Sequence, residues 1–92
     1  MSRGVTRESI DDCSGTVMTP SQSTVFANDQ LMAILGTSIA AHSPCPYIPI
    51  HCCATMSEAS EDVFAEGIGI CREGDECSCG HTSSGSSDVF VN

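Results

Sequence analysis

A short apolar phrase occurs three times along the chain, separated by polar and small residues. The phrase is Val-Phe followed by Ala or Val, at residues 25–27, 63–65 and 89–91. The first two copies begin longer segments, 23–37 and 61–75, which align at a constant offset (63 − 25 = 38 and 75 − 37 = 38). The third copy is shorter. Internal repetition of this kind indicates one supersecondary unit that is used several times around a shared core.

Each full copy of the repeat predicts a β-hairpin. The Val-Phe run is β-rich and is followed by turn residues, Asn28-Asp29 in the first copy and Glu66-Gly67 in the second. A second apolar run follows and ends at a glycine. In the first copy this run, residues 31–35, has good helix propensity, but its alignment with the second copy favours a strand. The last copy predicts a lone closing strand, which we expect to pair within a sheet and not to form a loose tail.

Composition limits the core that these hairpins can build. The chain has 92 residues, of which 40% are hydrophobic but only 4% aromatic, and its three phenylalanines, Phe26, Phe64 and Phe90, all lie in the repeated phrase. We expect these rings to supply most of the bulky core, with a role at a docking surface as the alternative. A domain this small often needs a metal, a disulfide or a partner for stability. The length predicts a single domain over 1–92, with 1–19 as an N-terminal extension and 20–92 as the repeat region.

The charge is strongly acidic. Twelve Asp and Glu stand against three Arg and no Lys, which gives a formal net charge of −9. Such a chain is repelled by nucleic acid and by an anionic membrane surface, so we exclude both as equilibrium partners. The chain opens without the apolar region of a signal peptide, and it lacks a run of about 18 apolar residues that could span a membrane.

Seven cysteines are dense for this length. In the reducing cytosol that we expect for folding, such cysteines serve as metal ligands or as small buried hydrophobic residues, and a disulfide scaffold is the alternative. We expect Cys13 to be a buried small residue, with a peripheral metal ligand as the alternative.

The three histidines, His42, His51 and His81, all lie between or after the predicted hairpins, in segments that also carry cysteines. One of these segments has three prolines within residues 44–49, which predicts an extended chain and not a helix. If the hairpins pack side by side, the loops converge at one end. Three imidazoles and one thiolate there would form a closed tetrahedral site for a structural Zn²⁺ ion. Three scattered surface histidines are the alternative. The candidate thiolates are Cys45, Cys52, Cys53, Cys77 and Cys79.

Two stretches of the chain, "GSSDVFVN" and "VFAEGIGICREGDECSCGH", resemble the PAAR-repeat family. The family phrase runs G-S-x-x-V-F-V-N-G, then x-P-A-A-R-x-G-D, then Cys-Gly. The positions that match are Gly67, Arg72, Gly74, Asp75, Cys79-Gly80, Gly85-Ser86 and Val89 to Asn92. The first copy departs from the phrase at Ser21-Gln22, Ile34 and Thr37, and neither copy has the Pro-Ala-Ala core, of which Ala33 alone stands in register. The resemblance covers about residues 20–92.

The resemblance implies an all-β fold, a small cone of short β-hairpins in a pseudo-threefold arrangement. It also implies one structural Zn²⁺ at the vertex of the cone, bound by three histidines and one cysteine. These correspond to His42, His51 and His81, with Cys79 at the family's Cys-Gly position. Cys77 is its competitor, while Cys52 and Cys53 beside His51 are weaker candidates. Mixed histidine and cysteine ligation favours zinc over iron.

The function that the resemblance implies is structural. A PAAR protein caps a trimeric β-helical spike, either VgrG-like or the central spike of a phage, as one copy, and sharpens it for piercing a target envelope. We therefore expect a place on a phage tail or baseplate or on an injection-system particle assembled in the cytoplasm, and a transient contact with the target outer membrane. The alternative is a small zinc-binding module for protein interaction. An enzyme is not expected, because the adjacent His51 and Cys52 point apart on an extended chain and make a poor catalytic pair.

Overall fold

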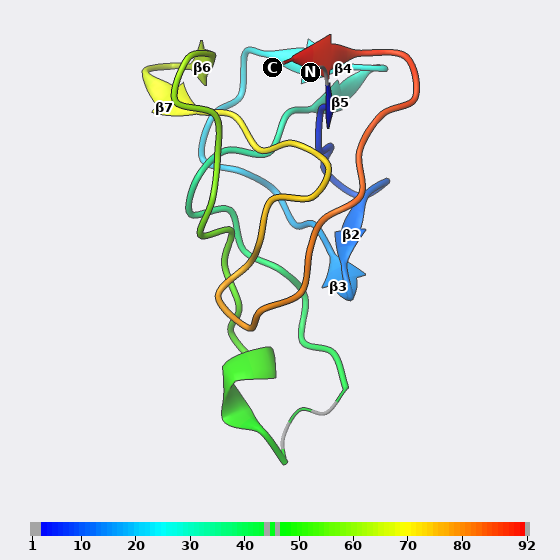
Figure 1. The fold of residues 1–92 in the computed structure, drawn as a ribbon, viewed down its shortest axis with the longest axis vertical. Helices are drawn as coiled ribbons and strands as arrows, with labels where there is room; N and C mark the ends of the chain where they lie inside the picture. Colours follow the sequence, from blue (N-terminus) through cyan, green and yellow to red (C-terminus); the bar gives the residue numbers. More distant parts are fainter. Residues whose placement is uncertain (1–2, 44, 46, 92) are drawn as a thin grey trace.

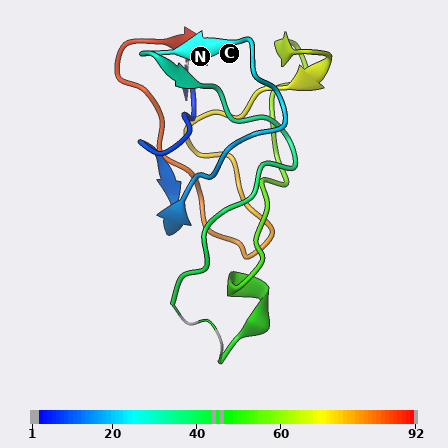
Figure 2. The ribbon, with the colours of Figure 1, turned by 180° about the vertical axis from the view of Figure 1, so that it is seen from behind.

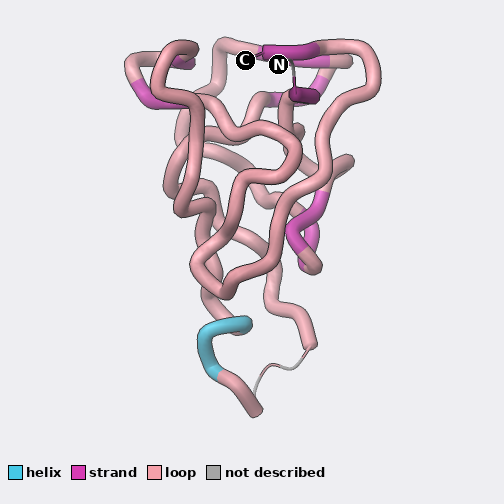
Figure 3. The backbone as a smooth tube through the Cα atoms, viewed as in Figure 1, coloured by secondary structure: helices cyan, strands magenta, loops and turns pink. Residues whose placement is uncertain are grey.

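The computed structural model describes residues 3–43, 45 and 47–91. They form a tapering body of 35 × 26 × 21 Å, with most hairpins and both ends of the chain at its broad end (Figure 1). The narrow end carries one turn of 3₁₀ helix, η1 (Pro49–His51) (Figure 1). Elsewhere the described chain consists of two-residue strands, isolated bridges and connecting loops (Figure 3). The predicted all-β class is confirmed.

Within the described residues, eight short strands form four antiparallel pairs: β1 (Arg3–Gly4) with β8 (Phe90–Val91), β2 (Asp12–Cys13) with β3 (Gly15–Thr16), β4 (Phe26–Ala27) with β5 (Gln30–Leu31), and β6 (Phe64–Ala65) with β7 (Ile68–Gly69). The hairpins β4-β5 and β6-β7 are related by the offset read from the sequence, since 64 − 26 = 38 and 68 − 30 = 38. The two predicted hairpins are therefore confirmed.

The third unit is built from both ends of the chain. Gly4 pairs with Phe90 and Arg3 with Val91, so the closing strand is paired within a sheet, as expected, and its partner is the first described strand of the chain. The described part of segment 1–19 also differs from an appended extension, because Val5, Cys13 and Val17 are fully buried in the body. The segment "RGVTR" lacks the Val-Phe phrase, and its role as the partner strand of β8 emerges only when the fold closes.

A closed ring of backbone hydrogen bonds joins the three units. The Thr6 N–H donates to the Cys71 carbonyl at 3.0 Å, the Ala33 N–H to the Thr6 carbonyl at 2.9 Å, and the Cys71 N–H to the Ala33 carbonyl at 2.9 Å. All three residues are completely buried. Buried peptide groups must be paired to be tolerated, and here each unit supplies the partner of the next.

The entry to each unit is held in one way. A side-chain oxygen accepts hydrogen bonds from the backbone N–H groups two and three residues further on; the three oxygens belong to Gln22, Ser60 and Ser86. Two different residue types therefore make the same local turn. This explains why Ser21-Gln22 can stand where the family has Gly-Ser.

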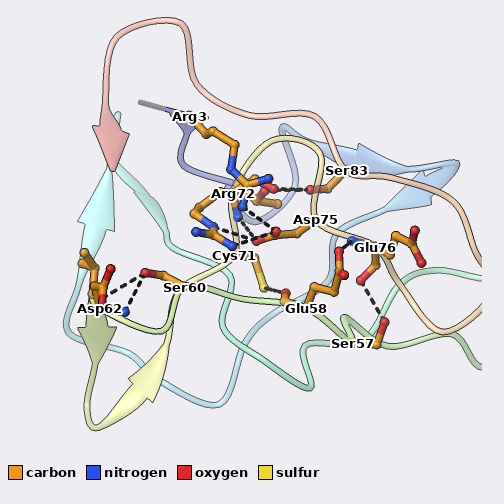
Figure 4. Close-up of polar contacts among 12 residues, drawn as sticks. Arg3, Ser57, Glu58, Ser60, Asp62, Cys71, Arg72, Asp75, Glu76 and Ser83 are labelled. Carbon is orange, nitrogen blue, oxygen red and sulfur yellow. Dashed lines mark hydrogen bonds and ion pairs between the residues drawn. The ribbon is translucent and has the colours of Figure 1, made fainter. Parts of the chain in front are cut away.

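An arginine–aspartate corner ties the third unit to the second. Figure 4 shows Arg3 and Arg72 both directed at Asp75, with Nη2–Oδ1 distances of 3.0 Å in each case. The Asp75 side chain is only 2% exposed, so these charge-assisted bonds satisfy a buried carboxylate. The hydrogen bond to Asp75 raises the pKa of Arg72.

The core is made of small side chains, and the expectation that the phenylalanines fill it is wrong. Phe26, Phe64 and Phe90 are 55%, 55% and 53% exposed. Successive residues of a strand face opposite sides, and in β4 and β6 the following alanine takes the buried side. The three strands lie at the broad end, as the reverse view also shows (Figure 2). The buried cluster nearest to them consists of Val5, Ala27, Ile34, Ala65 and Ile70.

Candidate metal centre

Toward the narrow end, four side chains converge from segments far apart in the sequence. The potential ligand atoms of His42, His51, Cys79 and His81 all lie within 4.8 Å of one another. His42 follows the bridge between Val17 and Ile39, and His51 is the last residue of η1. Cys79 and His81 lie in the turn after the bridge between Met56 and Cys77. The structure thus brings together all three histidines and the preferred cysteine.

The spacing of these atoms suits a small tetrahedral ion. His42 Nε2 lies 3.1 Å from His51 Nδ1 and 3.4 Å from Cys79 Sγ. The three imidazole centroids form a nearly equilateral triangle with sides of 5.1, 5.4 and 5.1 Å. Bond lengths of zinc to nitrogen and sulfur imply edges of about 3.3–3.8 Å in a tetrahedral site. These two distances are close to that range and the others do not exceed 4.8 Å, so the four groups can hold a metal ion.

Two further observations favour a metal ion between the imidazole rings. His81 Nε2 is buried and has no hydrogen-bond partner among the described residues, which is costly for a polar atom. The opposite nitrogen of His42, Nδ1, lies 2.9 Å from the Ala40 carbonyl. Only Nδ1–H can donate to that oxygen, so Nε2 keeps its lone pair directed at the cluster. A hydrogen-bonded far nitrogen is the usual arrangement for a metal-bound histidine.

The imidazoles differ in their tendency to take a proton. The hydrogen bond to the Ala40 carbonyl raises the pKa of His42, helped by the Cys79 side chain and opposed by burial. Burial lowers the pKa of His51, and the neighbouring His42 and His81 lower it further. Metal binding requires neutral imidazoles, so the environment of His51 already favours the form that can bind.

Among the cysteines, Cys79 alone joins the cluster. Cys77, its competitor in the sequence analysis, is buried behind it, with the two sulfur atoms 3.1 Å apart. Burial opposes ionisation of Cys77, yet its side-chain interactions with Cys13 and Cys79 outweigh it and lower its pKa. The predicted burial of Cys13 is confirmed, and its Sγ lies 3.1 Å from the His81 carbonyl, where it can donate a hydrogen bond.

A disulfide joins Cys45 to Cys52, across seven residues of sequence. The expectation of metal ligands or buried thiols alone is therefore wrong for this pair, while Cys53 is free and exposed. The expectation of no helix in the proline-rich segment is wrong for Pro49–His51, because proline at the first helical position loses no needed hydrogen bond. Pro44 and Pro46 lie outside the described residues.

Gly15 of β3 allows the closest packing against the cluster. A Cβ at this position would lie 2.7 Å from His42 Nδ1 and would clash with the Ala40 carbonyl. The absence of a side chain here lets the hydrogen bond between Ala40 and His42 form.

Comparison with known proteins agrees with this arrangement. A family model described as the PAAR motif matches residues 8–84 of the 92-residue chain. The chain belongs to the PAAR-motif family. The match begins inside the segment that the sequence analysis took as an extension. A search of curated proteins found no match.

Membership of the PAAR family indicates a spike-tip role in contractile injection systems and association with a spike protein such as VgrG. PAAR proteins are structural tip proteins and not enzymes. Within the described residues, no helix is both long enough and apolar enough to cross a membrane.

Proposed function

We propose that this PAAR protein caps a trimeric β-helical spike as a single copy, with its broad end docked on the spike and its narrow end leading. The proposal places it on a phage tail or an injection-system particle that is assembled in the cytoplasm. The observation that carries it is the difference between the two ends of the body. The broad end has exposed phenylalanines, and the His/Cys cluster lies toward the narrow end.

The base, defined here as the three strand pairs β1-β8, β4-β5 and β6-β7, supports docking. It presents Phe26, Phe64 and Phe90 from equivalent positions of three units, with almost equal exposure. Exposed apolar side chains that recur on one end of a small protein are typical of an interaction site. Three similar units facing one way suit a partner made of three identical chains.

At the vertex we propose one structural Zn²⁺ bound by His42, His51, Cys79 and His81. Four protein ligands leave no open position for a substrate, which is typical of a structural site. When bound, the ion supplies strong bonds between loops that are otherwise distant in sequence. The side chains themselves are already oriented: Ala40 holds His42, and the turn hydrogen bond from the Gly80 N–H to the Cys77 carbonyl positions the loop of Cys79.

Two measurements test the proposal. Elemental analysis of the purified chain should find about one zinc per molecule, and His81→Ala should lose it. A trimeric spike from the same particle should co-elute with the wild-type chain, and Phe64→Asp should abolish co-elution while keeping the metal. Met18→Asp is the control, since Met18 is similarly exposed, at 49%, but lies outside the base strands. A metal-free but stable wild type, or equal binding by Phe64→Asp, would contradict the respective half.

A further inference from the structure

At the extreme narrow end, apolar side chains face solvent. The vertex loop is defined here as residues 43, 45 and 47–52. It contains η1 and lies at the tip of the body (Figure 1). Tyr47 is 90% exposed, Ile48 is 50% exposed, and Pro49 is exposed as well. Tyr47, Ile48 and Pro49 belong to neither of the buried hydrophobic clusters. These side chains therefore do not serve the core.

The stretch of sequence that contains the vertex loop also lacks Asp, Glu, Lys and Arg. From Gln30 to Ser57, which is 28 residues (57 − 30 + 1 = 28), the chain has no Asp, Glu, Lys or Arg. The 15 charged residues of the protein (12 + 3 = 15) all lie outside this window. The vertex loop of this acidic molecule thus carries no Asp, Glu, Lys or Arg side chain. Solubility alone does not explain this distribution, because an exposed loop of a soluble protein usually carries charged side chains.

Part of the backbone of the vertex loop is already hydrogen-bonded to protein groups. The Cys45 N–H donates to the His42 carbonyl at 2.8 Å, the His51 N–H to the Ile48 carbonyl at 3.1 Å, and the Cys52 N–H to the Pro49 carbonyl at 2.9 Å. The disulfide between Cys45 and Cys52 closes the loop. Peptide groups that are already bonded can leave water at much lower cost than free ones.

We propose that the vertex loop inserts Tyr47 and Ile48 into the interfacial region of a zwitterionic lipid bilayer, which gives the spike tip an affinity of its own for lipid. Tyrosine prefers the membrane–water interface, where its ring is apolar and its hydroxyl stays hydrated. Interfacial binding grows with the apolar area that is buried and weakens when like charges face each other. The acidic body therefore favours a neutral lipid surface over an anionic one.

A lipid surface fits this point better than a protein does. Stable protein interfaces bury on the order of 800 Å² on each partner, far more than two side chains at a narrow tip can offer. A bilayer accepts a small apolar projection without matching its shape. The biological sense of this affinity rests on the proposed tip function, because the vertex would meet the target envelope first.

The chain provides its own probe for the test. Tyr47 is the only tyrosine and the chain has no tryptophan, so tyrosine fluorescence reports on the vertex alone. The purified full-length protein would be titrated with phosphatidylcholine vesicles, with and without bromine on the acyl chains, and vesicle binding measured by co-sedimentation. We expect quenching by the brominated lipid, and weaker binding when anionic phosphatidylglycerol is added, with the difference reduced at high salt.

Matched variants sharpen the test. Ile48→Asp should weaken vesicle binding by about tenfold or more, because a charge replaces an apolar side chain at the interface. Ile10→Asp should leave binding unchanged, since Ile10 has the same 50% exposure but lies outside the vertex loop. Equal loss in both variants, absence of quenching, or sedimentation without vesicles through self-association would overturn the proposal. Co-elution with the spike is measured separately, so failure of lipid binding is distinguishable from failure of capping.

Discussion

The base and the vertex of this small cone are stabilised by different means. At the base, short strands, a ring of backbone hydrogen bonds and a core of small residues share the load among many weak contacts. Toward the vertex, a disulfide and a His/Cys cluster link the loops, and Cys79 is the member of that cluster that packs against the other buried apolar cluster. A tapering body becomes too thin to bury side chains, so a few strong bonds must do what packing does elsewhere. A single substitution at the vertex should therefore have a large effect on metal binding or stability, whereas substitutions at the base should have small effects that depend on burial.

The largest effect is expected from the proposed thiolate ligand. Cys79→Ser should reduce metal affinity by more than about 100-fold, whereas Cys77→Ser, which removes a neighbour of the ligand, should cost about tenfold. Cobalt substitution distinguishes the two directly, because the sulfur-to-cobalt absorption band should disappear only in Cys79→Ser. A band that survives in Cys79→Ser and is lost in Cys77→Ser would reverse the assignment.

An intermediate effect is expected from the disulfide. Replacing Cys45 and Cys52 together with serine should lower the free energy of unfolding by about 2–3 kcal/mol, which is the chain-entropy value for so short a loop. Metal content should be retained, since neither residue belongs to the His/Cys cluster. Denaturant unfolding of the metal-loaded protein measures the change. Cys53 is an exposed free thiol, so Cys53→Ser is the control and should have no effect. If the double variant were as stable as the wild type, the disulfide would not stabilise the fold.

The smallest effect is expected at the base. Phe64→Ser should change the free energy of unfolding by less than about 1 kcal/mol, because the ring is 55% exposed. Ile70→Ala is the matched contrast, since Ile70 is 1% exposed, and truncation of such a side chain costs about 2–5 kcal/mol. Thermal or denaturant unfolding of the two variants decides. If Phe64→Ser were as damaging as Ile70→Ala, the phenylalanines would be structural and not docking residues.

The internal repeat in the sequence was enough to predict the two complete hairpins and the convergence of the histidines. The constant offset of 38 residues located both complete hairpins, and the confinement of His42, His51 and His81 to the connecting segments pointed to a common cluster. The pseudo-threefold arrangement itself stays a prediction. The matching hydrogen bonds made by Gln22, Ser60 and Ser86 agree with it.

Other features depend on closure of the chain and leave no local signal. The strand of Arg3 and Gly4 has none of the Val-Phe phrase, so its pairing with β8 was not predictable. Hydrophobicity alone placed the phenylalanines inside, but a two-residue strand with alanine on its buried face turns them out. The Cys45–Cys52 disulfide requires the turn made by η1, which the proline-rich composition concealed.

The pairing of β1 with β8 also sets an order in time. Gly4 and Phe90 are 86 residues apart (90 − 4 = 86), so during synthesis the first strand waits about 4–17 s for its partner. His81 leaves the ribosome ten residues before Val91 (91 − 81 = 10), so all members of the His/Cys cluster have emerged before the base can close. The chain can thus assemble the His/Cys cluster at its vertex before it completes the base by which it would dock on the spike.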